Sequence, residues 1–436
     1  MTDIPFTSYA FPATGAPTSR SMPDRLAEIK NVKDFGALGN GSANDRAAIQ
    51  AAIDWTSGAN RGIIFFPLGT YMVDAPLTFN YNGVLNIAFV GVIGTYIIGS
   101  PGFNDYIFKR SLGTPNYTPG GCIVFEKLNI QNPGVGASGT GGGIRVGSAN
   151  GVFIRDCTFS AFIDVTTEDS PGNSSQGVLF ENCIFGTQGQ VSGSHAIIIG
   201  GSGGLMACDC HNADVAFRVY GSGFYASGNR TENCNTGFLM GLDSAGTDRG
   251  ASGFALTSGG FEGNTTSIDL VGTCSGFLIG PYGALGHDSS NSGYPHGVQN
   301  SQYGLRIRAG KAQGGVIMFS GGSWFDQAPI AIENASSRAN LVFIGCQGKQ
   351  AGGSGSGWIF PTNAYTAQFI NCNVSIVWTF SQLPTGSNIF EGDEFDISDS
   401  TVNTWGANVT TGGGSNRVRV RYNNTGGSGN WTVVGK

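Results

Sequence analysis

Short stretches in which apolar and polar residues alternate recur along most of this chain. The clearest begin at Gly151 (GVFIRDCTF) and Gly177 (GVLFENCIF), and in both the second and fourth residues are apolar. Side chains that recur with period 2 lie on one face of a β-strand, so each stretch predicts a strand with one buried face. Related stretches, some with Gly or Asn in place of the cysteine, begin at Gly204, Gly223, Gly253, Gly276, Gly315, Asn340 and Thr366.

The spacing of these stretches indicates the architecture. Their starts are 26, 27, 19, 30, 23, 39, 25 and 26 residues apart, and a period in this range is typical of solenoids. A second short apolar run follows in most copies, for example at residues 196–199 and 216–219, with no helix between. Two or three short strands per repeat predict the coils of a parallel β-helix, whereas a leucine-rich repeat would need a helical segment.

A different pattern precedes the repeats. Residues 31–55 (NVKDFGALGNGSANDRAAIQAAIDW) predict a short strand, a Gly-rich turn and a helix, and residues 61–73 predict an apolar strand that ends at Pro67. A short helix followed by strands is expected to cap the open end of a solenoid. The apolar face of this helix carries Ala48, Ile49, Ala52 and Ile53.

The chain is expected to have three parts. Residues 1–30, rich in Pro, Ser and Thr, form an arm or connector. Residues 31–390 form the β-helix with its cap. Residues 391–436 form a strand-rich C-terminal cap or subunit contact, because two alternating runs around the turn-like NNTGGSGN predict a hairpin through Val418, Val420, Tyr422, Trp431 and Val433.

The capping segment resembles a known family. Residues 32–37 (VKDFGA), the turn at 39–41, Asp45 with its helix and residues 63–71 (IIFFPLGTY) are similar to the entry segment of the pectate-lyase-like right-handed β-helix superfamily. The resemblance implies an all-β, right-handed parallel β-helix, and the superfamily includes polysaccharide lyases, glycoside hydrolases and phage tailspikes. One departure is the family's usual GDG-x-x-DD turn, which here reads GNGSAND and has fewer carboxylates.

The arm also resembles the N-terminal lead of phage and prophage tail proteins, because residues 25–28 (RLAE) run into the DFGA segment. This implies attachment through the arm to a phage tail or baseplate protein, and a homotrimer of side-by-side β-helices as in tailspikes. A phage-encoded chain would lie in the virion, and any other would be extracellular. The first residues show no basic start followed by an apolar core, so no secretory signal is visible.

Composition narrows the possible partners. Gly accounts for 72 of 436 residues while hydrophobic residues reach 40%, which indicates many tight turns in an ordered chain. The net charge of −6 and the absence of a Lys/Arg run argue against nucleic acid. No segment approaches the roughly 18 consecutive apolar residues of a membrane helix.

The cysteines predict a structural row. Several cysteines occupy the same position in successive repeats, so their small side chains are expected to stack in a row as free, buried thiols. A disulfide framework would instead pair cysteines from different positions. Zinc at Cys208, Cys210 and His211 is not favoured because CxCH is not a usual zinc spacing. No dense Asp cluster supports calcium, and neither a metal nor a cofactor is expected. The row contains Cys157, Cys183, Cys210, Cys346 and Cys372.

The repeat also predicts which polar side chains meet. Residues at one offset in successive coils should lie about 4.8 Å apart, the spacing of neighbouring strands. Three residues past the cysteine-equivalent position, Asn229 leads to Glu232 and Gly259 leads to Glu262, so these acids should be stacked neighbours. Farther along, the same offset selects Trp324, with Asp326 just beyond.

Paired carboxylates point to glycoside hydrolysis. A separation of about 5–5.5 Å suits a retaining enzyme and about 6.5–9.5 Å an inverting one, and crowding should raise the pKa of one acid. The alternative is that each acid is a solvated turn residue. The predicted catalytic residues are Glu232, Glu262 and Asp326. The predicted substrate-binding residues are Asp214, Arg230, Tyr282, His287 and Trp324. Tyr282 and His287 lie in a long loop at 281–303, and long loops on a repeat scaffold commonly carry binding function, although this loop could also be a solvated excursion.

Three functions remain open. The first is a tailspike-like depolymerase that hydrolyses a bacterial surface polysaccharide or exopolysaccharide. The second is a lyase that acts by β-elimination at a uronic acid with a Lys, Arg or His base. The third is a non-catalytic glycan-binding fibre or assembly protein, which would retain oligosaccharide without shortening it.

Overall fold

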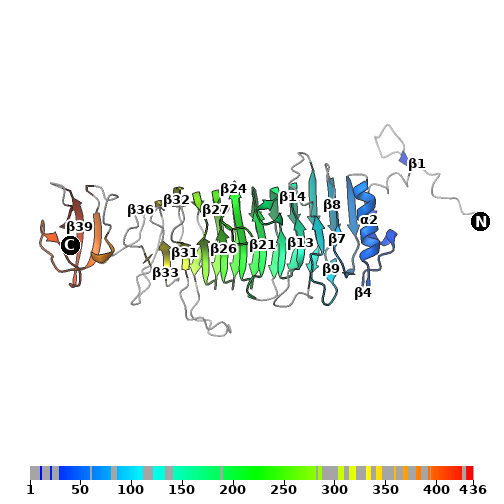
Figure 1. Ribbon diagram of the computed structural model, residues 1–436, viewed down its shortest axis with the longest axis horizontal. Helices are drawn as coiled ribbons and strands as arrows, with labels where there is room; N and C mark the ends of the chain where they lie inside the picture. Colours follow the sequence, from blue (N-terminus) through cyan, green and yellow to red (C-terminus); the bar gives the residue numbers. More distant parts are fainter. Residues whose placement is uncertain are drawn as a thin grey trace, which may run out of the picture. The chain divides into compact units, whose positions relative to one another are not determined.

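The computed structural model describes residues 10–11, 20–21, 29–58, 61–79, 86–110, 121–132, 141–186, 190–280, 283–286, 303–308, 314–320, 330–334, 340–345, 358–359, 367–371, 380–383, 391–392, 394–424 and 429–435. The chain divides into two compact units, residues 1–214 (unit 1) and 215–436 (unit 2), and each is described by itself. Both contain coils of a right-handed parallel β-helix, which confirms the predicted fold (Figure 1). No helix in the described part of the chain is long and apolar enough to span a membrane.

Unit 1 is built from three stacks of parallel strands. The first stack contains β3 (Ile29–Asn31), β5 (Arg61–Phe66), β8 (Asn86–Gly91), β11 (Cys122–Glu126), β14 (Asn150–Arg155), β19 (Gln176–Glu181) and β22 (Gly203–Met206). The second contains β4 (Asn40–Asn44), β6 (Thr70–Val73), β9 (Tyr96–Gly99), β12 (Asn129–Gln131), β15 (Thr158–Ser160), β20 (Ile184–Gly186) and β23 (Asp209–His211). The third contains β7 (Leu77–Thr78), β10 (Phe108–Arg110), β13 (Gly142–Val146), β16 (Ile163–Thr166) and β21 (His195–Gly200).

Two antiparallel pairs also lie in unit 1. β1 (Ala10–Phe11) pairs with β2 (Arg20–Ser21) in the arm, and β17 (Glu168–Ser170) pairs with β18 (Asn173–Ser174) in a loop after the third stack.

The predicted capping helix is present. A 3-10 helix, η2 (Val32–Phe35), is followed by α2 (Arg46–Gly58), which packs on β5 and β7. The apolar face of α2 is buried at Ile49, Ala52 and Ile53, as the sequence predicts. Asp45 connects the preceding turn to the helix, because its carboxylate accepts hydrogen bonds from the backbone N–H groups of Leu38 and Gly39 at 2.6 and 3.0 Å.

The interior of unit 1 follows the alternation in the sequence. Val152, Ile154, Val178 and Phe180 point inward and are buried. The chain bends between the first and second stacks at one left-handed residue per coil, and Asn and Asp tolerate this conformation best after glycine. Residues in this conformation include Asp156 (φ 53°) and Asn182 (φ 52°).

The buried cysteine row is confirmed at Cys157 and Cys183, with a correction to its register at the next coil. All seven cysteines in the described part of the chain are free, and Cys346 and Cys372 lie outside it. β20 pairs with β23 so that Phe185 faces Cys210, and therefore Cys208 follows Cys183 in the row. The prediction that Cys210 occupies this position is wrong by two residues, which period-2 alternation cannot detect because both residues point inward.

Unit 2 repeats the same coil. The first stack contains β25 (Phe224–Glu232), β27 (Ala251–Glu262), β29 (Cys274–Ile279), β32 (Gly314–Ser320), β34 (Asn340–Ile344) and β36 (Ala367–Ile370). The third contains β24 (Val215–Ser222), β26 (Thr236–Met240), β28 (Thr266–Leu270), β31 (Tyr303–Ile307), β33 (Ile330–Asn334) and β35 (Trp358–Ile359). β25 and β27 continue past bends at Gly228 and Ser258 into a second stack, where β30 (Gly283–Gly286) pairs with β27.

One repeat in unit 2 was also misplaced. β32 pairs with β29 so that Phe277 faces Ile317, after an irregularity between Ser275 and Phe277. The copy assigned to Gly315 therefore begins at Val316. Trp324, which was counted from this copy, lies outside the described residues, so its alignment with Glu262 stays a prediction.

The last part of unit 2 is a four-stranded antiparallel sheet. Its strands are ordered β37 (Glu394–Ser400), β39 (Asn416–Asn423), β40 (Asn430–Gly435) and β38 (Asn408–Val409), and a 3-10 helix, η3 (Phe380–Gln382), precedes it. The predicted hairpin is confirmed, since Val420 pairs with Val433 and Tyr422 with Trp431. These side chains share a core with Leu383 and Ile397.

Candidate functional site

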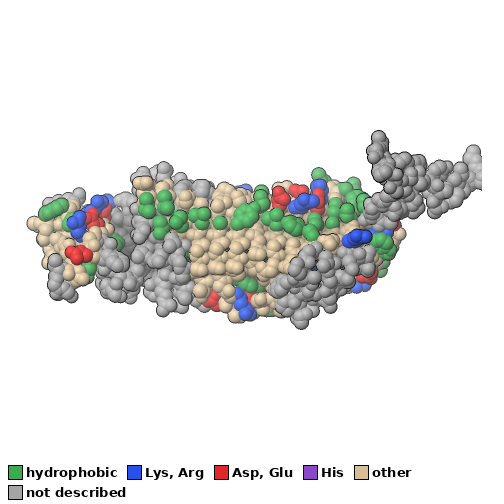
Figure 2. Space-filling model, turned by 90° about the horizontal axis from the view of Figure 1, so that it is seen from above, with side chains coloured by type: hydrophobic (Ala, Val, Ile, Leu, Met, Phe, Trp, Pro, Cys, Tyr) green, Lys and Arg blue, Asp and Glu red, His purple; other side chains and the backbone are tan. Residues whose placement is uncertain are grey.

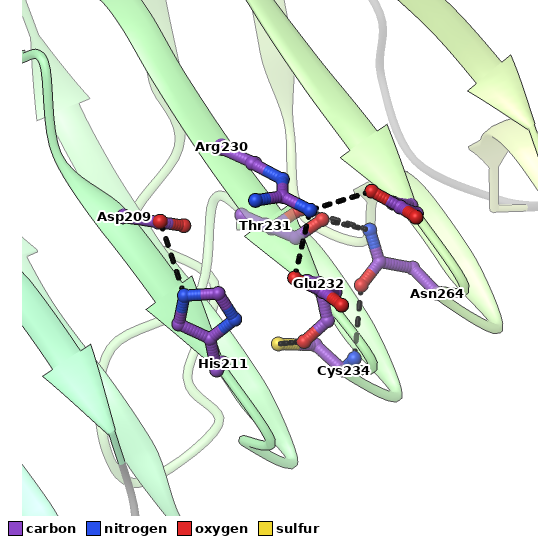
Figure 3. Close-up of polar contacts among 8 residues, drawn as sticks. Asp209, His211, Arg230, Thr231, Glu232, Cys234 and Asn264 are labelled. Atoms are coloured by element: carbon purple, nitrogen blue, oxygen red, sulfur yellow. Dashed lines mark hydrogen bonds and ion pairs between the residues drawn. The ribbon is translucent and has the colours of Figure 1, made fainter. Parts of the chain in front are cut away.

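Glu232, Glu262 and Arg230 form one charged cluster in unit 2. β25 and β27 run parallel with Glu232 opposite Glu262, which confirms that the two acids are neighbours. Nη2 of Arg230 lies 2.9 Å from Oε2 of Glu232 and 2.6 Å from Oε2 of Glu262. Figure 3 shows Arg230 above Glu232 on the outer face of the sheet. The predicted residues Arg230, Glu232 and Glu262 are therefore brought together.

The two carboxylates differ in exposure. The side chain of Glu232 is 20% exposed, that of Glu262 is 57% exposed and that of Arg230 is 45% exposed. Because both Oε2 atoms touch one nitrogen, they can be at most about 5.5 Å apart, which is below the roughly 6.5–9.5 Å of an inverting pair of acids.

An open space adjoins the cluster at Gly260, which faces Arg230 across the paired strands. A Cβ atom added at Gly260 would meet nothing within 4 Å, and its φ is not positive. Neither the backbone nor packing therefore requires glycine here. By contrast, nearby Gly263 has a φ of 63° and no room for a Cβ, because Oδ1 of Asn233 would lie at 2.6 Å.

The backbone beneath the cluster is bonded from coil to coil. Asn233 follows Glu232 in a left-handed conformation with φ 53°, and its N–H donates to the carbonyl of Glu262 at 2.9 Å. The buried amide of Asn264 bonds Thr231 and Cys234. The sequence analysis did not identify Asn264 or Gly260. The only signal for them is their position, since Asn264 lies two residues after Glu262 and Gly260 two residues before it.

The remaining predicted site residues do not join this cluster in the described structure. Asp214 lies in unit 1, where its Oδ2 accepts from the N–H of Gly193 at 2.7 Å. Tyr282, His287, Trp324 and Asp326 lie outside the described residues. Their roles stay predictions.

Unit 1 carries a separate pair on the outer face of β23. Nε2 of His211 lies 3.0 Å from Oδ2 of Asp209, and both side chains are half-buried. Cys208 and Cys210 are buried while His211 faces outward, so the CxCH residues do not converge on one point. Among the described residues, no three His, Cys, Asp or Glu side chains are grouped so that they could hold a metal ion.

Comparison with known proteins identifies the family. A family model described as rhamnogalacturonase A/epimerase, pectate lyase-like matches residues 29–247, which is half of the chain. The chain belongs to this family.

Curated relatives match only in part. Mannuronan C5-epimerase AlgE4 of Azotobacter vinelandii is 58% identical over 45 residues, which is 10% of this chain and 8% of the epimerase. A probable glucan endo-1,3-beta-glucosidase of Arthroderma benhamiae is 28% identical over 261 residues, which is 56% of this chain and 27% of that protein. The chain thus spans less than a third of the length of either relative.

Solved structures share the fold at low identity. The AlgE4 A-module of Azotobacter vinelandii has a TM-score of 0.57 and 16% identity, over 79% of this chain and 94% of that one. A tailspike protein mutant of E. coli bacteriophage HK620 in complex with pentasaccharide has a TM-score of 0.52 and 13% identity, over 85% and 76%. ORF18 of Geobacillus virus E2 has a TM-score of 0.52 and 14% identity, over 94% and 77%.

Proposed function

We propose that this protein is a tailspike-like depolymerase that hydrolyses a bacterial surface polysaccharide or exopolysaccharide, with Glu232 and Glu262 as its catalytic acids. The observation that carries the proposal is the pairing of these acids on neighbouring strands around Arg230. Family membership and the tailspike-like fold support a polysaccharide as substrate.

The spacing favours retention of anomeric configuration. One carboxylate attacks the anomeric carbon and displaces the leaving oxygen, which takes a proton from the other carboxylic acid, and water then hydrolyses the glycosyl-enzyme. Nη2 of Arg230 contacts the Oε2 atoms of both acids, whereas an acid that attacks or protonates the substrate must reach it directly. We therefore propose that bound substrate draws Arg230 away from one of the two acids.

The test is a screen of the purified protein against bacterial polysaccharides, mannuronan and a 1,3-β-glucan. Hydrolysis predicts shorter chains with new reducing ends. Glu232→Gln and Glu262→Gln should each lower kcat by at least about a hundredfold, because each removes a carboxylate that acts as acid, base or nucleophile. Glu394→Gln is the matched control, since Glu394 pairs with Arg421 in the C-terminal sheet. Full activity of both cluster variants would show that this pair is not catalytic.

The same screen separates the other functions. Unsaturated products that absorb in the ultraviolet would indicate β-elimination at a uronic acid. Retention of oligosaccharide with no shortening would indicate a glycan-binding fibre or assembly protein.

We also propose that copies of the chain associate as a homotrimer, with residues 1–30 serving as a connector to a phage tail. An apolar row on the outer face of the first stack of unit 1 supports association, because large exposed apolar patches mark contact surfaces. Figure 2 shows a line of hydrophobic side chains on this face. In order of strand pairing, the row contains Ile63, Ala88, Val124, Phe153 and Leu179.

A further inference from the structure

Asn264 bridges two coils directly beneath the carboxylate cluster. Its side chain is 5% exposed and lies two residues after Glu262, on the inner side of the coil. Its Nδ2 donates to the carbonyl of Thr231 at 3.2 Å and to the hydroxyl of Thr231 at 2.8 Å. Its Oδ1 accepts the backbone N–H of Cys234 at 2.9 Å (Figure 3).

These bonds enclose the bend that carries Glu232. Thr231 precedes Glu232, and Cys234 follows it by two residues, so one side chain satisfies backbone groups on both sides of the bend. Between them, Asn233 has a φ of 53° and donates its N–H to the carbonyl of Glu262. The direction of the Cα–Cβ bond of Glu232 depends on this bend, and these bonds tie the bend to the segment that carries Glu262 and Asn264.

We propose that Asn264 is a positioning residue that sets the separation of the Glu232 and Glu262 carboxylates, and that Thr231 is its partner in this role. The inference rests on the proposed catalytic function of the two acids. Neither Asn264 nor Thr231 touches substrate, since both side chains are buried inside the coil. Catalytic groups displaced by about 1 Å can lose up to about a hundredfold in rate, so a loosened bend should affect kcat before it affects substrate binding.

The chain offers a matched control. Asn132 is another buried asparagine that bonds coils together, and its Nδ2 donates to the carbonyls of Asp105 at 2.9 Å and Gly142 at 3.3 Å in unit 1. Asn264→Leu and Asn132→Leu both remove an amide that donates to backbone carbonyls of a neighbouring coil, and both keep the branched shape of the side chain at the same increase in volume. Both variants should lose thermal stability, because each leaves buried backbone groups without a partner.

Only the variants near the acids should lose catalysis. On the polysaccharide that the wild-type protein shortens, Asn264→Leu should lower kcat at least about tenfold, with KM changed less than about threefold and the pH profile of kcat altered. Asn132→Leu should keep the wild-type kcat and pH profile. Thr231→Val removes only the hydrogen bond from Nδ2 of Asn264 to the Thr231 hydroxyl and keeps the shape of the side chain at position 231. It therefore tests the inference even where Asn264→Leu fails to fold.

Thr231→Val should lower kcat by a smaller factor than Asn264→Leu. Where the double variant folds, its loss should be smaller than the product of the single losses, because both substitutions break the same bond.

Two results overturn the inference in distinguishable ways. In the first, Thr231→Val and any folded Asn264→Leu keep the wild-type kcat and pH profile while Glu232→Gln and Glu262→Gln are inactive. Asn264 would then be purely structural, and the proposed function would stand. Active Glu→Gln variants, or a wild-type protein that shortens no polysaccharide, would overturn the proposed function and this inference with it.

Discussion

Glu232 and Glu262 stand at paired positions of neighbouring strands, and their Oε2 atoms both contact Nη2 of Arg230. Two like charges on adjacent strands repel each other, and the guanidinium between them offsets that repulsion. Arg230 is therefore placed to control the spacing of the two carboxylates.

Replacing Arg230 should impair catalysis more than folding. Arg230→Gln removes the positive charge between the acids and lets them separate, so kcat/KM should fall by at least about tenfold, while an exposed ion pair contributes only about 0.2–1 kcal/mol to stability. Steady-state kinetics and thermal unfolding of the same preparation check both statements. Arg419→Gln, which breaks the exposed pair of Arg419 with Asp396 in the C-terminal sheet, should leave activity unchanged.

Side chains introduced at Gly260 should block substrate in proportion to their size. Gly260→Ala should fold normally, because the added Cβ meets nothing within 4 Å. Gly260→Trp should raise KM or abolish activity, since it fills the space beside Arg230, with little change in thermal stability. Ser252→Trp places the same side chain earlier on β27, in the first stack, and should remain active. Equal activity of Gly260→Trp and wild type would show that substrate does not occupy this space.

The period of the repeat predicted most of the fold because it reflects backbone geometry. Inward residues such as Val178 and Phe180 recur with period 2, and Asn or Asp recurs at the left-handed bend. The errors at Cys210 and Gly315 arose where glycines adjoin the start of a copy and allow alternative starts. Sequence alone cannot choose between these starts, because bulges and turn lengths set the register.

The site was predictable only in its backbone register. Counting from Asn229 and Gly259 placed Glu232 beside Glu262 because no irregularity interrupts β25 and β27 there. The shared contact to Arg230 depends on side-chain rotamers, which the repeat does not specify. The same is true of Asn264, whose partners become apparent only when two coils are stacked.

Asp164 should make stability depend on pH. It is fully buried in β16, its Oδ1 accepts the N–H of Ala161 at 2.6 Å, and its Oδ2 has no hydrogen-bond partner among the described residues. Burial raises the pKa of the Asp164 carboxyl well above its usual value, and the Ala161 N–H offsets this only in part. The folded protein therefore keeps a proton that the unfolded chain releases. Stability should fall as the pH rises from about 3.9 toward the folded pKa, and stay lower above it.

The test of this prediction is Asp164→Asn, which is uncharged at every pH and can still accept from Ala161. Its melting temperature should exceed that of the wild type at pH 7, and the difference should shrink as the pH approaches 4. Asp34→Asn, at an exposed position in η2, should show no such trend. A wild-type melting temperature at pH 7 equal to or above that of Asp164→Asn would contradict the assignment of a neutral, buried carboxyl.

A charge introduced into the apolar row of unit 1 should disrupt self-association. Phe153 is 38% exposed and lies between Val124 and Leu179 in the row, and with them it lines a pocket of about 240 Å³. Phe153→Glu should fold normally because the side chain is partly in solvent. Burying the new carboxylate in an apolar contact without a partner would be unfavourable, so the variant should dissociate to monomers at concentrations where the wild type is trimeric. Light scattering and sedimentation measure this dissociation directly.

Thr158→Glu is the control for this prediction, because it adds the same charge at a half-buried position of the second stack and should leave the assembly intact. A wild-type protein that is monomeric at all concentrations would refute the proposed trimer, and a trimeric Phe153→Glu would place its interface on another face.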